Sequence, residues 1–241
     1  MKKALVLGAS GATGQLLVRM LLQKGVDVIA IVRNADSLAN IDCSHHNVQI
    51  VEAEISEMSE SDLAQYLDEC EAVLSCLGHN LTFKGMFGHP KRLVTNAVKN
   101  VTKAIESLSG NKKIKIILMN TAGNSNRDIR ENPPHSQRFV ISLLRLLLPP
   151  LADNEEAADF LRVQVGQNGN NIEWVAVRPD SLIDEDHMSQ YDIHASPLRN
   201  AIFNSGSTSR INVADFMSEL VVNSELWDEW KGQMPVIYNN S

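Results

Sequence analysis

Three glycines spaced three residues apart, Gly8, Gly11 and Gly14, stand between a short apolar run and an apolar helical pattern. Glycine allows a tight turn after a strand, a close approach of phosphate to the backbone, and close packing of the next helix on the sheet. The N-terminus of that helix would face the phosphate charge. This spacing therefore predicts a loop that holds a pyrophosphate group.

A single arginine, Arg33, closes the next apolar run. Sites for NAD usually carry Asp or Glu about 20 residues after the glycines, where the carboxylate holds the ribose 2′-hydroxyl. A cation in that place can hold a 2′-phosphate instead. The glycine spacing and Arg33 together predict an NADP(H) site.

The composition is that of a globular protein with a full core, because 44% of the 241 residues are hydrophobic and 21% are charged. The formal net charge of −7 argues against a nucleic-acid partner or an anionic membrane surface. The longest apolar run, residues 139–151, is too short to span a bilayer. We expect a cytoplasmic protein with no membrane or nucleic-acid partner.

The three cysteines, Cys43, Cys70 and Cys76, are odd in number and show no Cys-x-x-Cys spacing, which favours reduced thiols. His45 and His46 lie next to Cys43 but lack a third ligand at suitable spacing, so no metal site is expected. Cys76, at the end of a predicted strand, is better explained as a small buried hydrophobe than as a reactive thiol.

Apolar runs and helical patterns alternate along the chain. The predicted strands are residues 4–7, 28–32, 48–51, 72–76, 114–119 and 173–177. The predicted helices cover residues 13–23, 63–67, 91–107 and 154–165. Strands that are apolar on both faces and separated by helices indicate an α/β fold with a doubly wound parallel sheet. We expect a single domain over residues 1–241, in which the less regular residues 179–241 contribute the substrate side.

Ligands of such sheets bind at the carboxyl ends of the strands. The candidate site therefore consists of the segments that directly follow the predicted strands. These segments are residues 8–14, 33, 54–55, 76–78, 120–123 and 178–182.

Motifs in this order resemble the atypical short-chain dehydrogenase/reductase superfamily, and more narrowly its NmrA-like and biliverdin/flavin-reductase-like branch of NAD(P)-binding Rossmann proteins. The likeness covers nearly the whole chain. The matching segments are Gly-Ala-Ser-Gly-Ala-Thr-Gly at 8–14, Ile-Val-Arg-Asn at 31–34, Leu-Ser-Cys-Leu-Gly at 74–78, Trp-Val-Ala-Val-Arg-Pro at 174–179 and Arg-Ile-Asn-Val-Ala-Asp-Phe at 210–216.

The resemblance implies a set of cofactor-binding residues. Those expected in the pyrophosphate loop are Gly8, Ser10, Gly11, Ala12, Thr13, Gly14 and Gln15. Those expected on the adenosine side are Arg33 at the 2′-phosphate, Glu54 and Ile55 at the adenine, and Leu77 and Gly78 at the adenosine and ribose. Those expected near the nicotinamide are Asn120 and Thr121 at its ribose and Pro179, Ser181 and Leu182 at the ring. Relatives usually carry Asp at the position of Glu54.

The chain departs from the family at the Tyr-x-x-x-Lys pair, in which the tyrosine acts as general acid and the lysine holds the ribose. Neither Tyr66 nor Tyr191 is followed by Lys four residues later, and Tyr238 lies too near the end. In the corresponding helix the chain has Glu155 and Asp159, one turn apart, which we interpret as a solvated helix face.

No catalytic residue can be assigned from the sequence. The nearest candidates for a proton donor are His79, His135, His187 and Tyr191, and geometry must decide among them. The apolar residues 139–151 fit a substrate wall, a subunit interface or core packing equally well.

Two functions are compatible with the absence of the Tyr-x-x-x-Lys pair. The first is an NADPH-dependent reductase of a small planar acceptor, such as a flavin, a quinone or a conjugated carbonyl, which can draw its proton from water. The alternative is a non-catalytic NADP(H) redox sensor of the NmrA type that acts through a protein partner. A nucleotide-sugar epimerase or dehydratase is disfavoured because such enzymes generally use the same Tyr/Lys pair. A homodimer remains open.

Overall fold

The computed structural model describes residues 2–39, 41, 48–79, 92–109, 112–129, 131, 134–167, 169 and 171–240. Within these residues, eight strands form one sheet in the order β3-β2-β1-β4-β5-β6-β10-β8. Every neighbouring pair is parallel except β10 and β8, which are antiparallel. A short parallel pair, β7 and β9, stands beside this sheet. The predicted parallel α/β sheet is therefore confirmed.

The elements have the following bounds. The strands are β1 (Lys3–Leu7), β2 (Asp27–Val32), β3 (Val48–Glu52), β4 (Ala72–Ser75), β5 (Ile114–Met119), β6 (Ile172–Pro179), β7 (Ser181–Ile183), β8 (Tyr191–His194), β9 (Ser207–Ser209) and β10 (Val236–Asn239). The helices are α1 (Ala12–Gln23), α2 (Glu60–Leu67), α4 (Leu93–Ser107), α5 (His135–Leu147), α6 (Pro149–Phe160), α7 (Arg210–Val222) and α8 (Ser224–Trp230).

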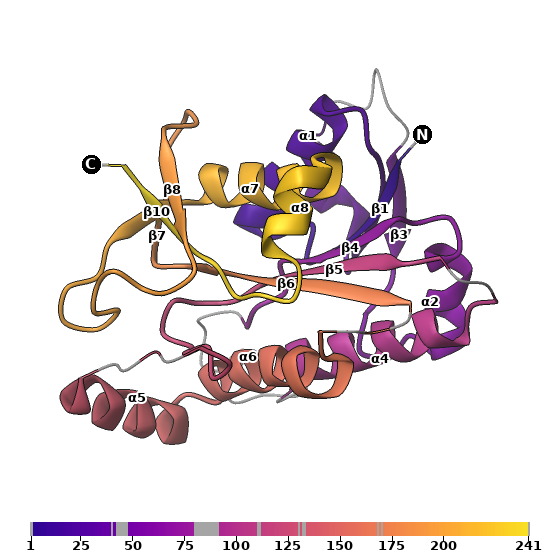
Figure 1. The fold of residues 1–241 in the computed structure, drawn as a ribbon. Helices are drawn as coiled ribbons and strands as arrows, with labels where there is room; N and C mark the ends of the chain where they lie inside the picture. Colours follow the sequence, from indigo (N-terminus) through magenta and orange to yellow (C-terminus); the bar gives the residue numbers. More distant parts are fainter. Residues whose placement is uncertain are drawn as a thin grey trace.

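Helices cover both faces of the sheet, as Figure 1 shows: α1, α7 and α8 on one side, and α2, α4 and α6 on the other. The alternation of side chains along β1 explains this arrangement, because Ala4 and Val6 pack into the first layer and Leu5 and Leu7 into the second. The doubly wound architecture follows from strands that are buried on both faces.

The region after Pro179 is more regular than the sequence suggests. Strand β10 pairs with the end of β6 and extends the sheet, although it was not predicted. Helix α7 packs along α1 and is buried on nearly every side, so it carries no amphipathic stripe by which it could have been recognised. None of the described helices is long and apolar enough to cross a membrane.

The apolar residues 139–151 span the end of one helix and the start of the next. Phe139, Leu143 and Leu147 follow one another at helical spacing on α5, and their exposed fractions are 72%, 48% and 53%. Core packing is therefore the wrong interpretation for these three side chains. Helix α5 leads directly into α6.

A buried ion pair joins the end of β6 to the loop that follows β5. Arg178, at the end of β6, is fully buried, and its Nη2 lies 2.7 Å from Oε1 of Glu131. The same guanidinium donates to the carbonyl oxygens of Asn124, Ala195 and Met234. All nitrogens of the guanidinium therefore donate hydrogen bonds. This one side chain holds the loop after β5, the segment after β8 and the residues just before β10.

We predict that Glu131→Gln lowers the free energy of unfolding by about 3–5 kcal/mol, because it leaves the buried Arg178 cation without its counter-charge. The measurement is denaturant unfolding. Asp228→Asn is the matched control, since it breaks the exposed Lys231–Asp228 pair and should cost less than about 1 kcal/mol. Equal effects of the two substitutions would contradict the role given to the Arg178–Glu131 pair.

Candidate functional site

The turn between β1 and α1 has no room for side chains at two of its three glycines. A Cβ added to Gly8, whose φ is +75°, would lie 2.8 Å from the backbone carbonyl of Cys76 at the end of β4. A Cβ at Gly14 would lie 2.1 Å from the carbonyl oxygen of Gly8. At Gly11 the nearest atom is 3.3 Å away, so the chain itself leaves this position more open. The close approach of strand, turn and helix therefore requires glycine at 8 and 14.

The first turn of α1 is open at its N-terminus. Gly11 occupies the N-cap position, and among the described residues no side-chain cap accepts from the first backbone N–H groups of the helix. Such groups have no partner within the helix and attract anions. The glycine-containing turn, followed by N–H groups without a cap, suits the binding of a pyrophosphate, which is the ligand that the glycine spacing predicts.

The guanidinium of Arg33 is exposed just after β2, and no described residue forms an ion pair or a hydrogen bond with it. Its loop is fixed against the glycine turn by Gln15, whose Nε2 donates to the carbonyl oxygens of Ser10 and Ser37 at 3.2 Å each. Gln15 therefore holds two loops together. Arg33 is left as a cation without a counter-charge beside the glycine turn.

The sheet order places the predicted site residues in one row along the carboxyl edge. From β3 to β6 the strands run in the order β3-β2-β1-β4-β5-β6. The residues that follow them, in this order, are Glu54 and Ile55; Arg33; the glycine turn; Leu77 and Gly78; Asn120 and Thr121; and Pro179, Ser181 and Leu182. The predicted positions therefore lie along one edge of the sheet, and which cofactor group each would contact stays a prediction.

The loops after β5 and β6 are bonded to each other. The N–H of Ala122 donates to the carbonyl oxygen of Pro179 at 2.9 Å. Asn120 Oδ1 accepts from the N–H of Thr121 and from Nδ2 of Asn124, and its own Nδ2 donates to the backbone carbonyl of Asn154 at 2.7 Å. Asn120 therefore ties the end of β5 to α6.

Asp153, which the sequence analysis did not single out, caps a neighbouring helix. It is buried, and its carboxylate accepts from the backbone N–H groups of Val94 and Thr95 in the first turn of α4 at 2.8 and 2.9 Å. Its Oδ2 is also 2.8 Å from Nε2 of His79. An acidic residue in one helix gives no sequence signal that it caps another. The contact makes His79 part of the packing between α4 and α6.

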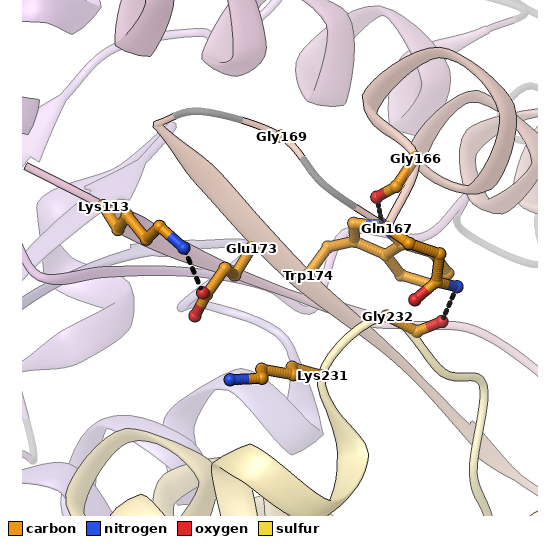
Figure 2. A pocket seen from close by; sticks show the side chains of 8 residues that line it. All are labelled: Lys113, Gly166, Gln167, Gly169, Glu173, Trp174, Lys231 and Gly232. Carbon is orange, nitrogen blue, oxygen red and sulfur yellow. Dashed lines mark hydrogen bonds and ion pairs between the residues drawn. The ribbon is translucent and has the colours of Figure 1, made fainter. Parts of the chain in front are cut away.

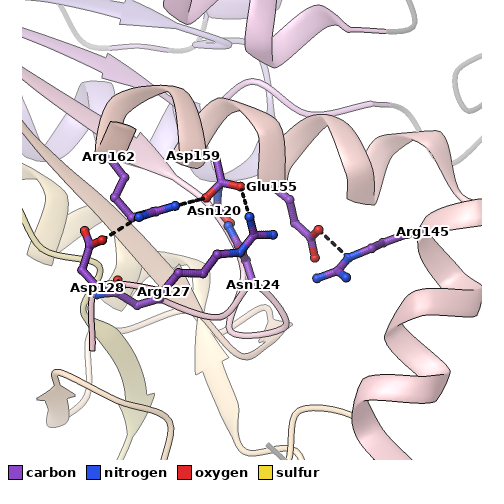
Figure 3. Close-up of polar contacts among 9 residues, drawn as sticks. Asn120, Asn124, Arg127, Asp128, Arg145, Glu155, Asp159 and Arg162 are labelled. Carbon is purple, nitrogen blue, oxygen red and sulfur yellow. Dashed lines mark hydrogen bonds and ion pairs between the residues drawn. The ribbon is translucent and has the colours of Figure 1, made fainter. Parts of the chain in front are cut away.

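The carboxylates of α6 are not a solvated face, so that interpretation is wrong. Glu155 is only 6% exposed, and its Oε2 lies 2.5 Å from Nε of Arg145 on α5. Asp159 is paired with Arg127 at 2.7 Å and with Arg162 at 3.2 Å. Figure 3 shows these arginines beside α6: Arg145 comes from α5, Arg127 from the loop after β5, and Arg162 from the turn that directly follows α6.

The family of the chain follows from a comparison with known proteins. A family model of NAD(P)H-binding proteins matches residues 8–224. The chain belongs to this NAD(P)H-binding family. The match confirms the resemblance seen in the motifs, and membership indicates a nicotinamide dinucleotide as the cofactor.

Solved structures share the fold of this NAD(P)H-binding protein. The oxidoreductase ylbE from Lactococcus lactis is 18% identical, with a TM-score of 0.69 over 99% of this chain and 91% of that chain. A candidate NADH-flavin reductase from Streptococcus pneumoniae is 16% identical, with a TM-score of 0.65 over 100% of both chains. The anaerobillin reductase ChuY from Escherichia coli O157:H7 is 16% identical, with a TM-score of 0.68 over 100% and 98%. No curated protein sequence matches the chain.

The other candidate proton donors of this NAD(P)H-binding protein are placed as follows. The Tyr191 hydroxyl donates to Oδ2 of Asp215 at 2.7 Å, and burial together with this carboxylate raises the pKa of Tyr191. A raised pKa makes Tyr191 a poor acid. His187 is exposed in the segment before β8, and the side chain of His135 lies outside the described part of the structure. Cys43, His45 and His46 lie outside the described residues as well.

Two cavities lie at the opposite, amino edge of the sheet and share Lys113 and Glu173. Their volumes are about 350 and 390 Å³. Figure 2 shows the first cavity, where Lys113 pairs with Glu173 and the Trp174 indole donates to the carbonyl of Gly166. These cavities are at the far end of the strands from the glycine turn, so they do not belong to the candidate cofactor site.

The second of these cavities is lined by Lys115, whose Nζ donates to the carbonyl oxygens of Leu220 and Val221 in the last turn of α7. The same nitrogen lies 4.6 Å from the ring centroid of Trp227. Burial, with a contribution from nearby Lys2, lowers the pKa of Lys115 to about 8. Lys115 therefore has a structural role as a cap of α7.

We predict that Cys70 and Cys76 resist alkylation by iodoacetamide at pH 8 in the folded protein. Both thiols are buried, and burial raises the pKa of each to about 12, so almost no thiolate is present. Mass spectrometry of the digested protein measures labelling at each site. Protein unfolded in denaturant serves as the control and should be labelled at both positions. Labelling of folded Cys76 at the rate of a free thiol would contradict its assignment as a buried hydrophobe.

Proposed function

We propose that the protein is an NADPH-dependent reductase of a small planar acceptor such as a flavin, a quinone or a conjugated carbonyl. The observation that carries the cofactor preference is the exposed, uncompensated guanidinium of Arg33 beside the glycine turn. A 2′-phosphate would supply the missing counter-charge, and a charge-assisted contact of this kind is stronger than a neutral one. In this proposal the uncapped first turn of α1 binds the pyrophosphate, and Asn120, Thr121 and Pro179 border the nicotinamide nucleoside.

The nicotinamide would supply a hydride to the acceptor when the cofactor is bound. The residues of this chain bind and orient rather than exchange protons. Glu155 and Asp159 on α6 are held in ion pairs with arginines, and Tyr191 is bonded to Asp215. Acceptors whose reduced form takes its proton from water need positioning more than a protein acid, which favours planar conjugated acceptors over simple ketones.

A second candidate, a non-catalytic NADP(H) sensor, is favoured by a different observation. Phe139, Leu143 and Leu147 form an exposed apolar face on α5. Such a face suits a protein partner or a second copy of the chain. A sensor must bind NADP⁺ and NADPH with different affinities, because equal affinity shifts no equilibrium.

We predict that Arg33→Asp weakens NADPH binding by roughly 2–4 kcal/mol and leaves NADH binding unchanged. The substitution removes the cation that would hold the 2′-phosphate and adds a repelling charge. Calorimetric titration with each cofactor measures the difference. Arg19→Asp, at an exposed position on α1, makes the same change of charge and should alter neither affinity. Equal weakening of NADPH and NADH by Arg33→Asp would show that Arg33 does not bind the 2′-phosphate.

We expect NADPH to be consumed in the presence of at least one acceptor from a panel of a free flavin, a water-soluble quinone and an α,β-unsaturated aldehyde. The loss of NADPH absorbance measures turnover. Gly11→Val is the control variant: a Cβ at position 11 would lie 3.3 Å from the carbonyl oxygen of Gly8, a closer contact than usual but far less severe than at Gly8 or Gly14, and a side chain there would keep phosphate away from the backbone. No turnover with any acceptor, together with different affinities for NADP⁺ and NADPH, would overturn the reductase and support the sensor.

A further inference from the structure

The last turn of α7 is held by two lysine amines that share one acceptor. Nζ of Lys115, in β5, lies 3.0 Å from the carbonyl oxygen of Leu220 and 3.3 Å from that of Val221. Nζ of Lys2, just before β1, lies 3.1 Å from the same oxygen of Val221. Two ammonium groups beside one oxygen repel each other, and this repulsion favours the neutral form of an amine.

Lys115 has no counter-charge in direct contact. No carboxylate in the described part of the chain forms an ion pair with its amine. Glu173 stands opposite Lys115 in the neighbouring strand β6. The two oxygens of Glu173 are already used, because they accept from Nζ of Lys113 at 2.8 Å and from the indole N–H of Trp227 at 2.7 Å.

The charges around Lys115 act in both directions on its pKa. Burial lowers this pKa most, and the nearby Lys2 ammonium lowers it further. The carboxylates of Glu173, Glu71 and Asp228 oppose the effect. The resulting pKa is about 8, so roughly 10% of the amine is neutral at pH 7. A neutral amine is a nucleophile, whereas an ammonium group is not.

The side chain of Lys115 can be reached from the second cavity at the amino edge of the sheet, whose volume is about 390 Å³. The other charged residues that line this cavity are Glu71, Lys112, Lys113, Glu173 and Asp228. Because both signs of charge are present, the cavity suits a small electrophile that carries no charge. The neutral amine still donates its two N–H groups to the two carbonyls of α7, and no described residue donates to its lone pair.

We propose that the ε-amine of Lys115 is a site of reversible carbamylation by carbon dioxide. The nitrogen lone pair forms a bond to the carbon, one C–O π pair moves onto an oxygen, and a proton passes from the nitrogen to water. The product is an N-carboxylate, and the step needs neither oxidant nor reductant. Its negative charge lies beside the Lys2 ammonium, so a repulsive pair becomes an attractive one. The remaining N–H still donates to α7.

The test traps the carbamate on the folded protein. The protein is equilibrated at pH 8 with isotope-labelled carbon dioxide and bicarbonate and alkylated with triethyloxonium ion, which converts a carbamate into a stable ethyl ester. Mass spectrometry of the digest then locates the isotope, which is absent from the esters of Asp and Glu. We expect at least about 10-fold more label on Lys115 than on any other lysine. At pH 6 and the same dissolved carbon dioxide, this label should fall at least about 10-fold, because the amine is protonated.

Two variants test the role of Lys2. Lys2→Gln removes both the repelling cation and the counter-charge of the carbamate, so it should lower the label on Lys115 about 5-fold or more. Lys3→Gln is the matched control, because it makes the same change at an amine that pairs with Glu69 and should leave the label unchanged. Thermal unfolding of both variants checks that the fold is intact.

The outcomes separate a built site from ordinary lysine chemistry. Absence of label on Lys115, or equal label on all lysines of the folded protein, would overturn the proposal. Unchanged label in the Lys2→Gln variant would overturn it as well. Protein unfolded in denaturant before labelling should show no preference for Lys115, and a preference that persists there would contradict a site formed by the fold.

Discussion

At the turn between β1 and α1 the backbone is packed so closely that a side chain at position 8 would collide with the end of β4, and one at position 14 with the turn itself. This contact sets how near α1 can come to the sheet. It also sets where the open first turn of α1 points, and, through Gln15, where the Arg33 loop lies. The site depends on this packing more than on any catalytic side chain.

At the carboxyl ends of β5 and β6, the polar side chains hold neighbouring loops and helices together. Arg178 and Glu131 fix the loop after β5, Asp153 joins α6 to α4, and the arginines around α6 neutralise its carboxylates. Two buried oxygens on α6, Oδ1 of Asn154 and Oε1 of Glu155, form no hydrogen bond in this network.

Much of the fold could be predicted because β1, β2, β4, β5 and β6 are largely apolar and buried, and the strands alternate with helices. The glycine turn and Arg33 could be predicted because their chemistry depends on local spacing. The burial of Glu155, the capping of α4 by Asp153 and the Arg178–Glu131 pair could not, since each depends on contacts between residues distant in sequence. Helix α7 was missed because a helix buried all round has no periodic pattern.

The central claim is that the glycine turn and Arg33 form an NADP(H) site. Trp174 and Trp227 line the cavities at the opposite edge, so calorimetry is a better probe than intrinsic fluorescence. We would titrate the unmodified protein with NADPH and with NADH under the same conditions. We expect NADPH to bind at least about 30-fold more tightly than NADH, which corresponds to a difference of about 2 kcal/mol. Equal affinities for the two cofactors, or no binding of either, would contradict it.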